Sequence, residues 1–135
     1  MADLTELEWS YLAGIFDGEG NIFLQIKSDR AETCALNIRA RIANTSEELM
    51  EWTQEKFGGN LTVYNGRTTN HKGVFQLAWY SRSEVARVLS GMLPYLIIKK
   101  WVAENVIGLL ALPNNMPLEK LELAKLIKGG QHHER

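Results

Sequence analysis

Short segments in which apolar and polar residues alternate recur along this chain. In residues 22–28 and 36–42, every second position is apolar and the positions between are mostly polar. The same alternation returns in residues 61–65 and 74–80. Because successive side chains of a strand point to opposite faces, this period of two predicts half-buried strands, arranged as two consecutive pairs.

Helical signals precede and separate the strand pairs. Thr5 and Glu8 form a capping-box pattern, which predicts that a helix begins there. A second capping box, Thr45 with Glu48, predicts another helix, which ends at Gly58 and the glycine after it.

Three further helices are predicted after the second strand pair. Ser81 and Glu84 begin the first of them, which ends before Pro94. Residues 95–112 are predicted to form one continuous apolar helix, and residues 117–128 a short amphipathic one. The expected order is therefore αββαββα, followed by helical extensions at the C-terminus.

This order of elements predicts an α+β fold. Strands that follow one another in pairs, rather than alternating with helices, favour an antiparallel sheet with helices on one face. The chain has 135 residues, 45% of them hydrophobic, and no break in composition. It is long enough to bury a core, and we expect one domain over residues 1–135.

The other face of the sheet would remain uncovered, and its polar side chains suggest a ligand. The net charge is only −1, but residues 21–45 and 60–82 together hold seven Lys or Arg against two acids. A β-ribbon can enter the major groove of DNA, where Arg pairs with guanine and Asn or Gln with adenine. An ordinary polar sheet face, the alternative, usually mixes both signs of charge. The candidate DNA-binding residues are Phe23, Gln25, Lys27, Asn37, Arg39, Arg41, Thr62, Tyr64, Arg67 and Gln76.

Other features of the composition argue against several classes of protein. The single cysteine, Cys34, excludes a disulfide framework and a Cys-rich metal site, and the three histidines show no ligand spacing. No signal peptide is recognisable, and no apolar run reaches the length of a membrane span. We expect an intracellular protein of the cytoplasm or of an organelle matrix or stroma, neither secreted nor bound to a membrane.

The segment Tyr11–Ile22, YLAGIFDGEGNI, points most directly to a function. Gly14 and Gly18 share one helix face, where the missing side chains allow another backbone to approach closely. Asp17 and Glu19 follow at the end of the helix, where the helix dipole disfavours acids. Carboxylates at such a place suggest a metal ion or another cation. The structural alternative is a buried Gly/Ala helix that ends in a solvated acidic turn.

This segment resembles the signature of the LAGLIDADG homing endonucleases, DNA-cutting enzymes named after a nine-residue motif. The identical positions are Leu12, Ala13, Gly14, Asp17 and Gly20. Ile15 and Phe16 are conservative, Gly18 replaces an alanine, and Glu19 stands where the motif names aspartate. The order of the predicted strands also matches. The resemblance covers roughly residues 9–112 and implies an αββαββα fold with a saddle-shaped antiparallel sheet.

Two further segments strengthen the resemblance. Residues 93–100, LPYLIIKK, are similar to the family's Pro-x-Leu-x-x-Lys segment, whose lysine reaches the active site; here that lysine is Lys99. Residues 42–49 are similar to the end of the family's second strand, where a polar side chain positions water, and Asn44 matches it. Without the motif, Lys99 would be interpreted as a snorkelling lysine and Asn44 as a turn residue beside a helix cap.

The resemblance implies Mg²⁺-dependent hydrolysis of phosphodiester bonds. Glu19 would bind Mg²⁺ with the help of the Gly18 carbonyl, and Mn²⁺ or Ca²⁺ are alternative occupants; hard oxygen ligands suit these ions. Asn44 would orient the attacking water, and Lys99 would stabilise charge or assist proton movement. Arg41 would contact DNA or lie near the scissile phosphate.

A single motif supplies one metal-binding acid, so the resemblance further implies a homodimer. Tyr11, Gly14 and Gly18 form the helix face expected to meet its twin, although the same glycines can instead admit a neighbouring core helix. A symmetric dimer would make a double-strand cut in a long pseudo-palindromic DNA target. The alternatives are an RNA maturase acting on intron RNA, a non-cleaving DNA-binding regulator, and a small oligomeric enzyme on an unrelated α+β scaffold.

Overall fold

The predicted order of helices and strands is present in a computed structural model, which describes residues 3–28, 34–64 and 73–131. The elements are α1 (Glu6–Glu19), β1 (Gly20–Ser28), β2 (Ala35–Asn44), α2 (Glu47–Phe57), β3 (Asn60–Tyr64), β4 (Val74–Trp79), α3 (Arg82–Met92), the 3₁₀ turn η1 (Leu93–Tyr95), α4 (Lys100–Ala111) and α5 (Pro117–Gln131). The order αββαββα runs from α1 to α3, and α4 and α5 are the C-terminal extensions.

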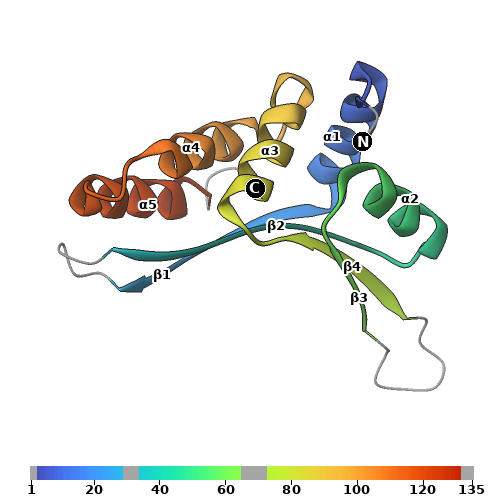
Figure 1. Ribbon diagram of the computed structural model, residues 1–135, viewed down its shortest axis with the longest axis horizontal. Helices are drawn as coiled ribbons and strands as arrows, with labels where there is room; N and C mark the ends of the chain where they lie inside the picture. The colour runs from blue at the N-terminus through green and yellow to red at the C-terminus, as the bar shows by residue number, and fades with distance from the viewer. Residues whose placement is uncertain (1–2, 29–33, 65–72, 132–135) are drawn as a thin grey trace.

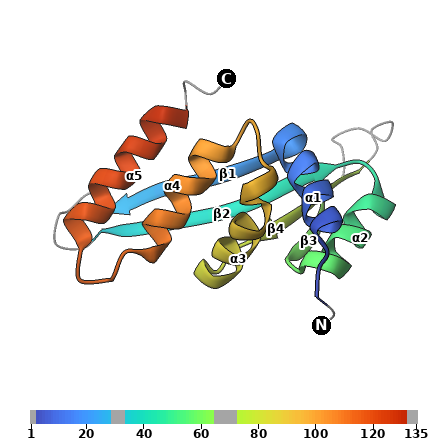
Figure 2. The ribbon, with the colours of Figure 1, turned by 90° about the horizontal axis from the view of Figure 1, so that it is seen from above.

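The described strands form one antiparallel sheet in the order β1-β2-β4-β3. Gly20 of β1 lies opposite Ile42 of β2, and Ile42 lies opposite Leu77 of β4. The helices lie on one face of the sheet and leave the other uncovered (Figure 1), and they run across the strands when seen from above (Figure 2). The predicted α+β fold with an antiparallel sheet is confirmed.

The alternating pattern sorts the side chains of β1, β2 and β4 as predicted, whereas Val63 of β3, predicted to face inward, is 53% exposed. Ile22, Leu24, Ile42 and Leu77 face the helices and are at most 5% exposed, and they belong to the same core as the fully buried Phe16 of α1. Complete burial of such a side chain contributes about 1.5–3 kcal/mol. A slip of one residue would turn a whole strand over, so this burial fixes the register.

Reciprocal hydrogen bonds fix the start of α1. The backbone N–H of Glu8 donates to Oγ1 of Thr5 at 3.1 Å, and the backbone N–H of Thr5 donates to Oε1 of Glu8 at 2.9 Å. The predicted capping box is confirmed. The Thr5 N–H, together with Lys56 at 3.3 Å, lowers the pKa of the Glu8 carboxyl.

The start of α2 differs from the prediction. Its N-cap is Ser46, whose Oγ accepts the Leu49 N–H at 3.2 Å. The predicted capping box of Thr45 with Glu48 is therefore wrong by one residue. The reason is that β2 continues to Asn44, whose Oδ1 accepts the Ser46 N–H at 2.7 Å.

The predicted continuous helix over residues 95–112 is also wrong. The chain forms a 3₁₀ turn at Leu93–Tyr95 and is extended at Leu96, and α4 begins only at Lys100. The backbone N–H groups of residues 97–99 donate to a side chain of α1 instead of to preceding carbonyl groups. The interruption therefore has a tertiary cause, which also shapes the candidate site.

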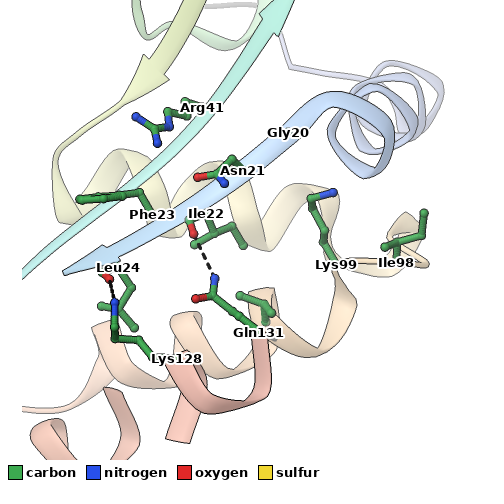
Figure 3. A pocket seen from close by; sticks show the side chains of 11 residues that line it. Gly20, Asn21, Ile22, Phe23, Leu24, Arg41, Ile98, Lys99, Lys128 and Gln131 are labelled. Carbon is green, nitrogen blue, oxygen red and sulfur yellow. Dashed lines mark hydrogen bonds between the residues drawn. The ribbon is translucent and has the colours of Figure 1, made fainter. Parts of the chain in front are cut away.

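The C-terminal helix α5 covers the outer edge of β1. Lys128 donates from Nζ to the Leu24 carbonyl oxygen at 2.8 Å, and Gln131 donates from Nε2 to the Ile22 carbonyl oxygen at 3.0 Å (Figure 3). These bonds satisfy acceptors that an edge strand otherwise exposes, and they hinder pairing with another chain. Like the other described helices, α5 is too short or too polar to cross a membrane.

Candidate functional site

Glu19 is the last residue of α1 and lies where the helix passes directly into β1. A side chain at the next position, Gly20, would collide with Phe16, because a Cβ there would lie 2.6 Å from the Phe16 carbonyl oxygen. The same oxygen accepts the Gly20 N–H and closes the helix. Glycine therefore allows the chain to turn from helix to strand without a loop, and the exposed carboxylate of Glu19 is held beside the sheet.

Asn44, the last residue of β2, is hydrogen-bonded to Glu19. Its Nδ2 donates to Oε2 of Glu19 at 2.6 Å, and its Oδ1 accepts the Ser46 N–H at 2.7 Å. The pairing of Gly20 with Ile42 brings the two strand ends together. Because Ser46 fixes the orientation of the amide, Asn44 holds one carboxylate oxygen of Glu19. No other described residue is hydrogen-bonded to that carboxylate.

Asp17, the other acid of the motif, has a different environment. Its carboxylate accepts the backbone N–H groups of Ile97, Ile98 and Lys99 at 2.8, 3.2 and 3.0 Å. Lys99 also donates from Nζ to the Asp17 carbonyl oxygen at 2.8 Å, which places a cation at the end of α1 where the helix dipole favours it. Asp17 thus tethers the segment before α4 and holds Lys99 on the helix that presents Glu19.

We expect Asp17→Asn to destabilise the fold. The amide keeps one oxygen for these N–H groups but loses the charge and the second acceptor, and a hydrogen bond to a charged group contributes about 1.5–3 kcal/mol. Urea unfolding should show a loss of about 1–3 kcal/mol with an unchanged m-value. The matched control is Glu104→Gln, an exposed acid of α4, which should change stability by less than about 0.5 kcal/mol. Equal stability of the two variants would contradict the tether.

A groove of about 480 Å³ lies beside the junction of α1 and β1 (Figure 3). Arg41, Lys99 and Lys128 line it together with Gly20 and Gln131, and its described lining contains no acid. Basic side chains that converge on a groove favour an anion such as a phosphate group. The structure therefore brings two of the predicted catalytic residues, Lys99 and Arg41, to the same groove.

The predicted DNA-reading residues extend over the face opposite the helices. In the observed register, Phe23 pairs with Arg39, Gln25 with Asn37, and Thr62 with Gln76. Alternation along the strands places Arg41 and Tyr64 on the same face, and Lys27 is exposed at a bulge between Ile26 and Ser28. Arg67, like Arg30 and Lys72 of the basic segments, lies outside the described residues, so its place in the interface stays a prediction.

Tyr11, Gly14 and Gly18 form an exposed face of α1. Tyr11 is 56% exposed, and a Cβ added at Gly14 or Gly18 would meet no atom of the described chain within 4 Å. The alternative, in which these glycines admit a neighbouring core helix, is therefore wrong. Leu7, one turn earlier on the same face, is 83% exposed. This face is available to a partner.

The site fits a divalent cation only in part. No cluster of three His, Cys, Asp or Glu side chains that could hold a metal ion occurs among the described residues. Glu19 offers a hard carboxylate oxygen, and Mg²⁺ is usually bound by one or two carboxylates, water and substrate phosphate. Gly18, beside it, is exposed, and its predicted role as a carbonyl ligand stays a prediction. Because the described residues hold no larger cluster of ligands, water and substrate phosphate would complete the set.

Several residues that shape the site carry little or no signal in the sequence. Ser46 carries a weak signal, because serine followed by acids is a typical N-cap. Lys128 and Gln131 have none, since they reach β1 across separations of 104 and 109 residues.

Comparison with known proteins gives matches only among solved structures. No protein-family model matches the sequence, and no curated protein matches it. The homing endonuclease I-CvuI, in complex with the I-CreI target in the presence of 2 mM Mg with DNA not cleaved, has a TM-score of 0.72 and 22% identity. This match covers 96% of the present chain and 83% of I-CvuI.

Two further structures agree. The homing endonuclease I-TnaI has a TM-score of 0.62 and 18% identity over 99% of the present chain and 100% of its own. The LAGLIDADG homing endonuclease I-SmaMI, bound to cleaved DNA, has a TM-score of 0.66 and 18% identity over 94% of the present chain and 43% of its own. The fold is that of the LAGLIDADG homing endonucleases. The match spans all of I-TnaI but less than half of I-SmaMI. The LAGLIDADG fold predicted from the motif and the order of the strands is confirmed.

Proposed function

We propose that this chain is a site-specific DNA endonuclease of the LAGLIDADG homing type, which cuts both strands of a long pseudo-palindromic target. The observation that carries the proposal is the exposed carboxylate of Glu19, which accepts a hydrogen bond from Nδ2 of Asn44 at 2.6 Å and directly precedes Gly20, a residue of the basic groove's lining. Hydrolysis of a phosphodiester needs a metal-binding acid and cations close to the phosphate. The DNA complexes of I-CvuI and I-SmaMI support DNA as the substrate.

Each residue of the site has a proposed role. Glu19 binds Mg²⁺, with the Gly18 carbonyl as an additional ligand, and Mn²⁺ or Ca²⁺ as alternative occupants; I-CvuI complexes with Mg and with Ca support a divalent ion. When bound, the ion supplies charge neutralisation at the phosphoryl group. Asn44 orients the attacking water, because Ser46 fixes its amide. Lys99 brings positive charge to the scissile phosphate, and Arg41, which lines the same groove, contacts the DNA.

We further propose that the active unit is a homodimer. One chain provides a single Glu19, and the uncovered face of Tyr11, Gly14 and Gly18 would bring two α1 helices, and with them two Glu19 carboxylates, to a twofold axis. The match to less than half of I-SmaMI supports two copies per functional unit. Residues 1–135 would form a single domain in each subunit, and the outer sheet face of each subunit would read one half-site in the major groove.

Supercoiled plasmids that carry random inserts test this proposal. With the protein and Mg²⁺, a small set of inserts should be cut once through both strands, and no linear product should form in EDTA. The selected inserts should contain twofold-related half-sites, because protein symmetry imposes symmetry on the target. Binding without cutting would instead support a DNA-binding regulator or an RNA maturase. A protein that neither binds nor cuts DNA would contradict the proposal.

A further inference from the structure

Two arginines on the outer face of the sheet are held by aromatic rings. The guanidinium carbon of Arg39 lies 5.3 Å from the centroid of the Phe23 ring and 5.4 Å from that of the Tyr80 ring. The guanidinium carbon of Arg41 lies 5.3 Å from the same Phe23 ring, and Figure 3 shows the side chains of Arg41 and Phe23 on the sheet. We call the series Tyr80, Arg39, Phe23 and Arg41 the arginine stack.

The arginine stack follows from the strand register. Phe23 lies directly opposite Arg39 in the ladder of β1 and β2, and Arg41 lies two positions further along the same face. Trp79, the last residue of β4, pairs with Ala40 of β2. Continuing this antiparallel register by one residue brings Tyr80 beside Arg39.

The rings hold the guanidinium groups without using their terminal hydrogen-bond donors. In the described part of the chain, no carboxylate pairs with Arg39 or Arg41, and Arg39 donates only from Nε, to Oδ1 of Asn37 at 3.5 Å. A carboxylate would occupy the donors in a bidentate pair, whereas an aromatic face attracts the cation and leaves them accessible. Guanine presents two acceptors in the major groove that match a guanidinium group.

We propose that Phe23 and Tyr80 are positioning residues that set the base specificity of Arg39, and that Phe23 does the same for Arg41. An unrestrained arginine loses rotamer freedom when it binds, and an arginine that is already stacked loses less. This proposal rests on the proposed function, since it assigns the arginines to guanine reading in a DNA target. It differs from the prediction that Phe23 itself binds DNA.

The arginine stack predicts that loss of Tyr80 affects the base preference of one arginine and that loss of Phe23 affects the base preference of both. Binding of the homodimer to a randomised DNA library is measured first for Arg39→Lys and Arg41→Lys, which identify the base pairs that each arginine reads. Tyr80→Leu should then lower the preference about three- to tenfold at the base pairs of Arg39 alone. Phe23→Leu should lower it by a similar factor at the base pairs of both arginines.

Two more variants make the test specific to the rings. Phe23→Tyr keeps an aromatic ring and should retain both preferences. Tyr64→Leu removes another aromatic side chain of the outer face, and among the described residues no arginine stacks on the Tyr64 ring. This variant should leave the preference at the base pairs of Arg39 and Arg41 unchanged. The proposal fails if Phe23→Leu changes the preference at a base pair that neither arginine reads, or if it changes the preference at no base pair.

A measurement without DNA separates this proposal from the proposed function. In the NMR spectrum of the protein alone, ring currents should shift the side-chain protons of Arg39 upfield, and Tyr80→Leu and Phe23→Leu should each remove part of that shift. Unshifted protons in the wild type would overturn the arginine stack whatever the DNA result. Shifted protons in a protein that binds no DNA would overturn the proposed function and, with it, the reading role of the stack.

Discussion

Glu19→Gln should abolish DNA cleavage and leave DNA binding intact. Glutamine has nearly the same size, and its amide oxygen can still accept from Nδ2 of Asn44, so the exposed end of α1 should keep its structure. Only the charge that binds the divalent ion is lost. Loss of a metal site removes several kcal/mol of transition-state stabilisation, so the rate should fall by about a thousandfold or more. Single-turnover cleavage in Mg²⁺ and fluorescence anisotropy with labelled target measure the two properties.

Glu104→Gln is the matched control for this substitution. Glu104 is an exposed acid of α4 and does not line the groove, so its variant should cut at the wild-type rate. If Glu19→Gln also cut at the wild-type rate under saturating Mg²⁺, Glu19 would not be the metal ligand. If Glu19→Gln lost DNA binding together with cleavage, its bond to Asn44 would be structural rather than catalytic.

The sheet is predictable from the sequence because its pattern is local. Ile22 and Leu24 alternate with Phe23 and Gln25, and only a register that buries the first pair leaves the second pair on the outer face. The residue at which a helix starts depends on more than the local sequence pattern. Thr45 and its neighbour Ser46 are both suitable N-caps, and the choice is set by how far β2 continues in its pairing with β4.

The candidate site is predictable only in part. The motif places Glu19 at the end of a helix, and the resemblance singles out Asn44, which the structure brings to 2.6 Å from it. The break in the predicted helix over residues 95–112 depends on Asp17, whose carboxylate binds the Ile97 N–H across a separation of 80 residues. Tertiary hydrogen bonds of this kind override local helix propensity, and no window of the sequence contains both partners.

Gly18→Ser should dissociate the homodimer while the subunit stays folded. A Cβ at Gly18 would meet no atom of the described chain within 4 Å, so the substitution creates no clash inside a subunit. At a twofold axis, however, two hydroxymethyl groups would enter the space between two close α1 helices. Overpacking typically costs about 1–3 kcal/mol, and symmetry applies it twice, so the dissociation constant should rise by about thirtyfold or more.

Sedimentation at micromolar concentration measures this dissociation. The wild type should sediment near twice 15.3 kDa, and Gly18→Ser should shift toward the monomer. Gly108→Ser is the matched control and should remain dimeric. Gly108 is an exposed glycine of α4, and a Cβ added there would likewise meet no atom of the described residues within 4 Å. Double-strand cutting should fall with the fraction of dimer, since one chain supplies one Glu19. A wild-type monomer that cuts both strands at one site would contradict the homodimer.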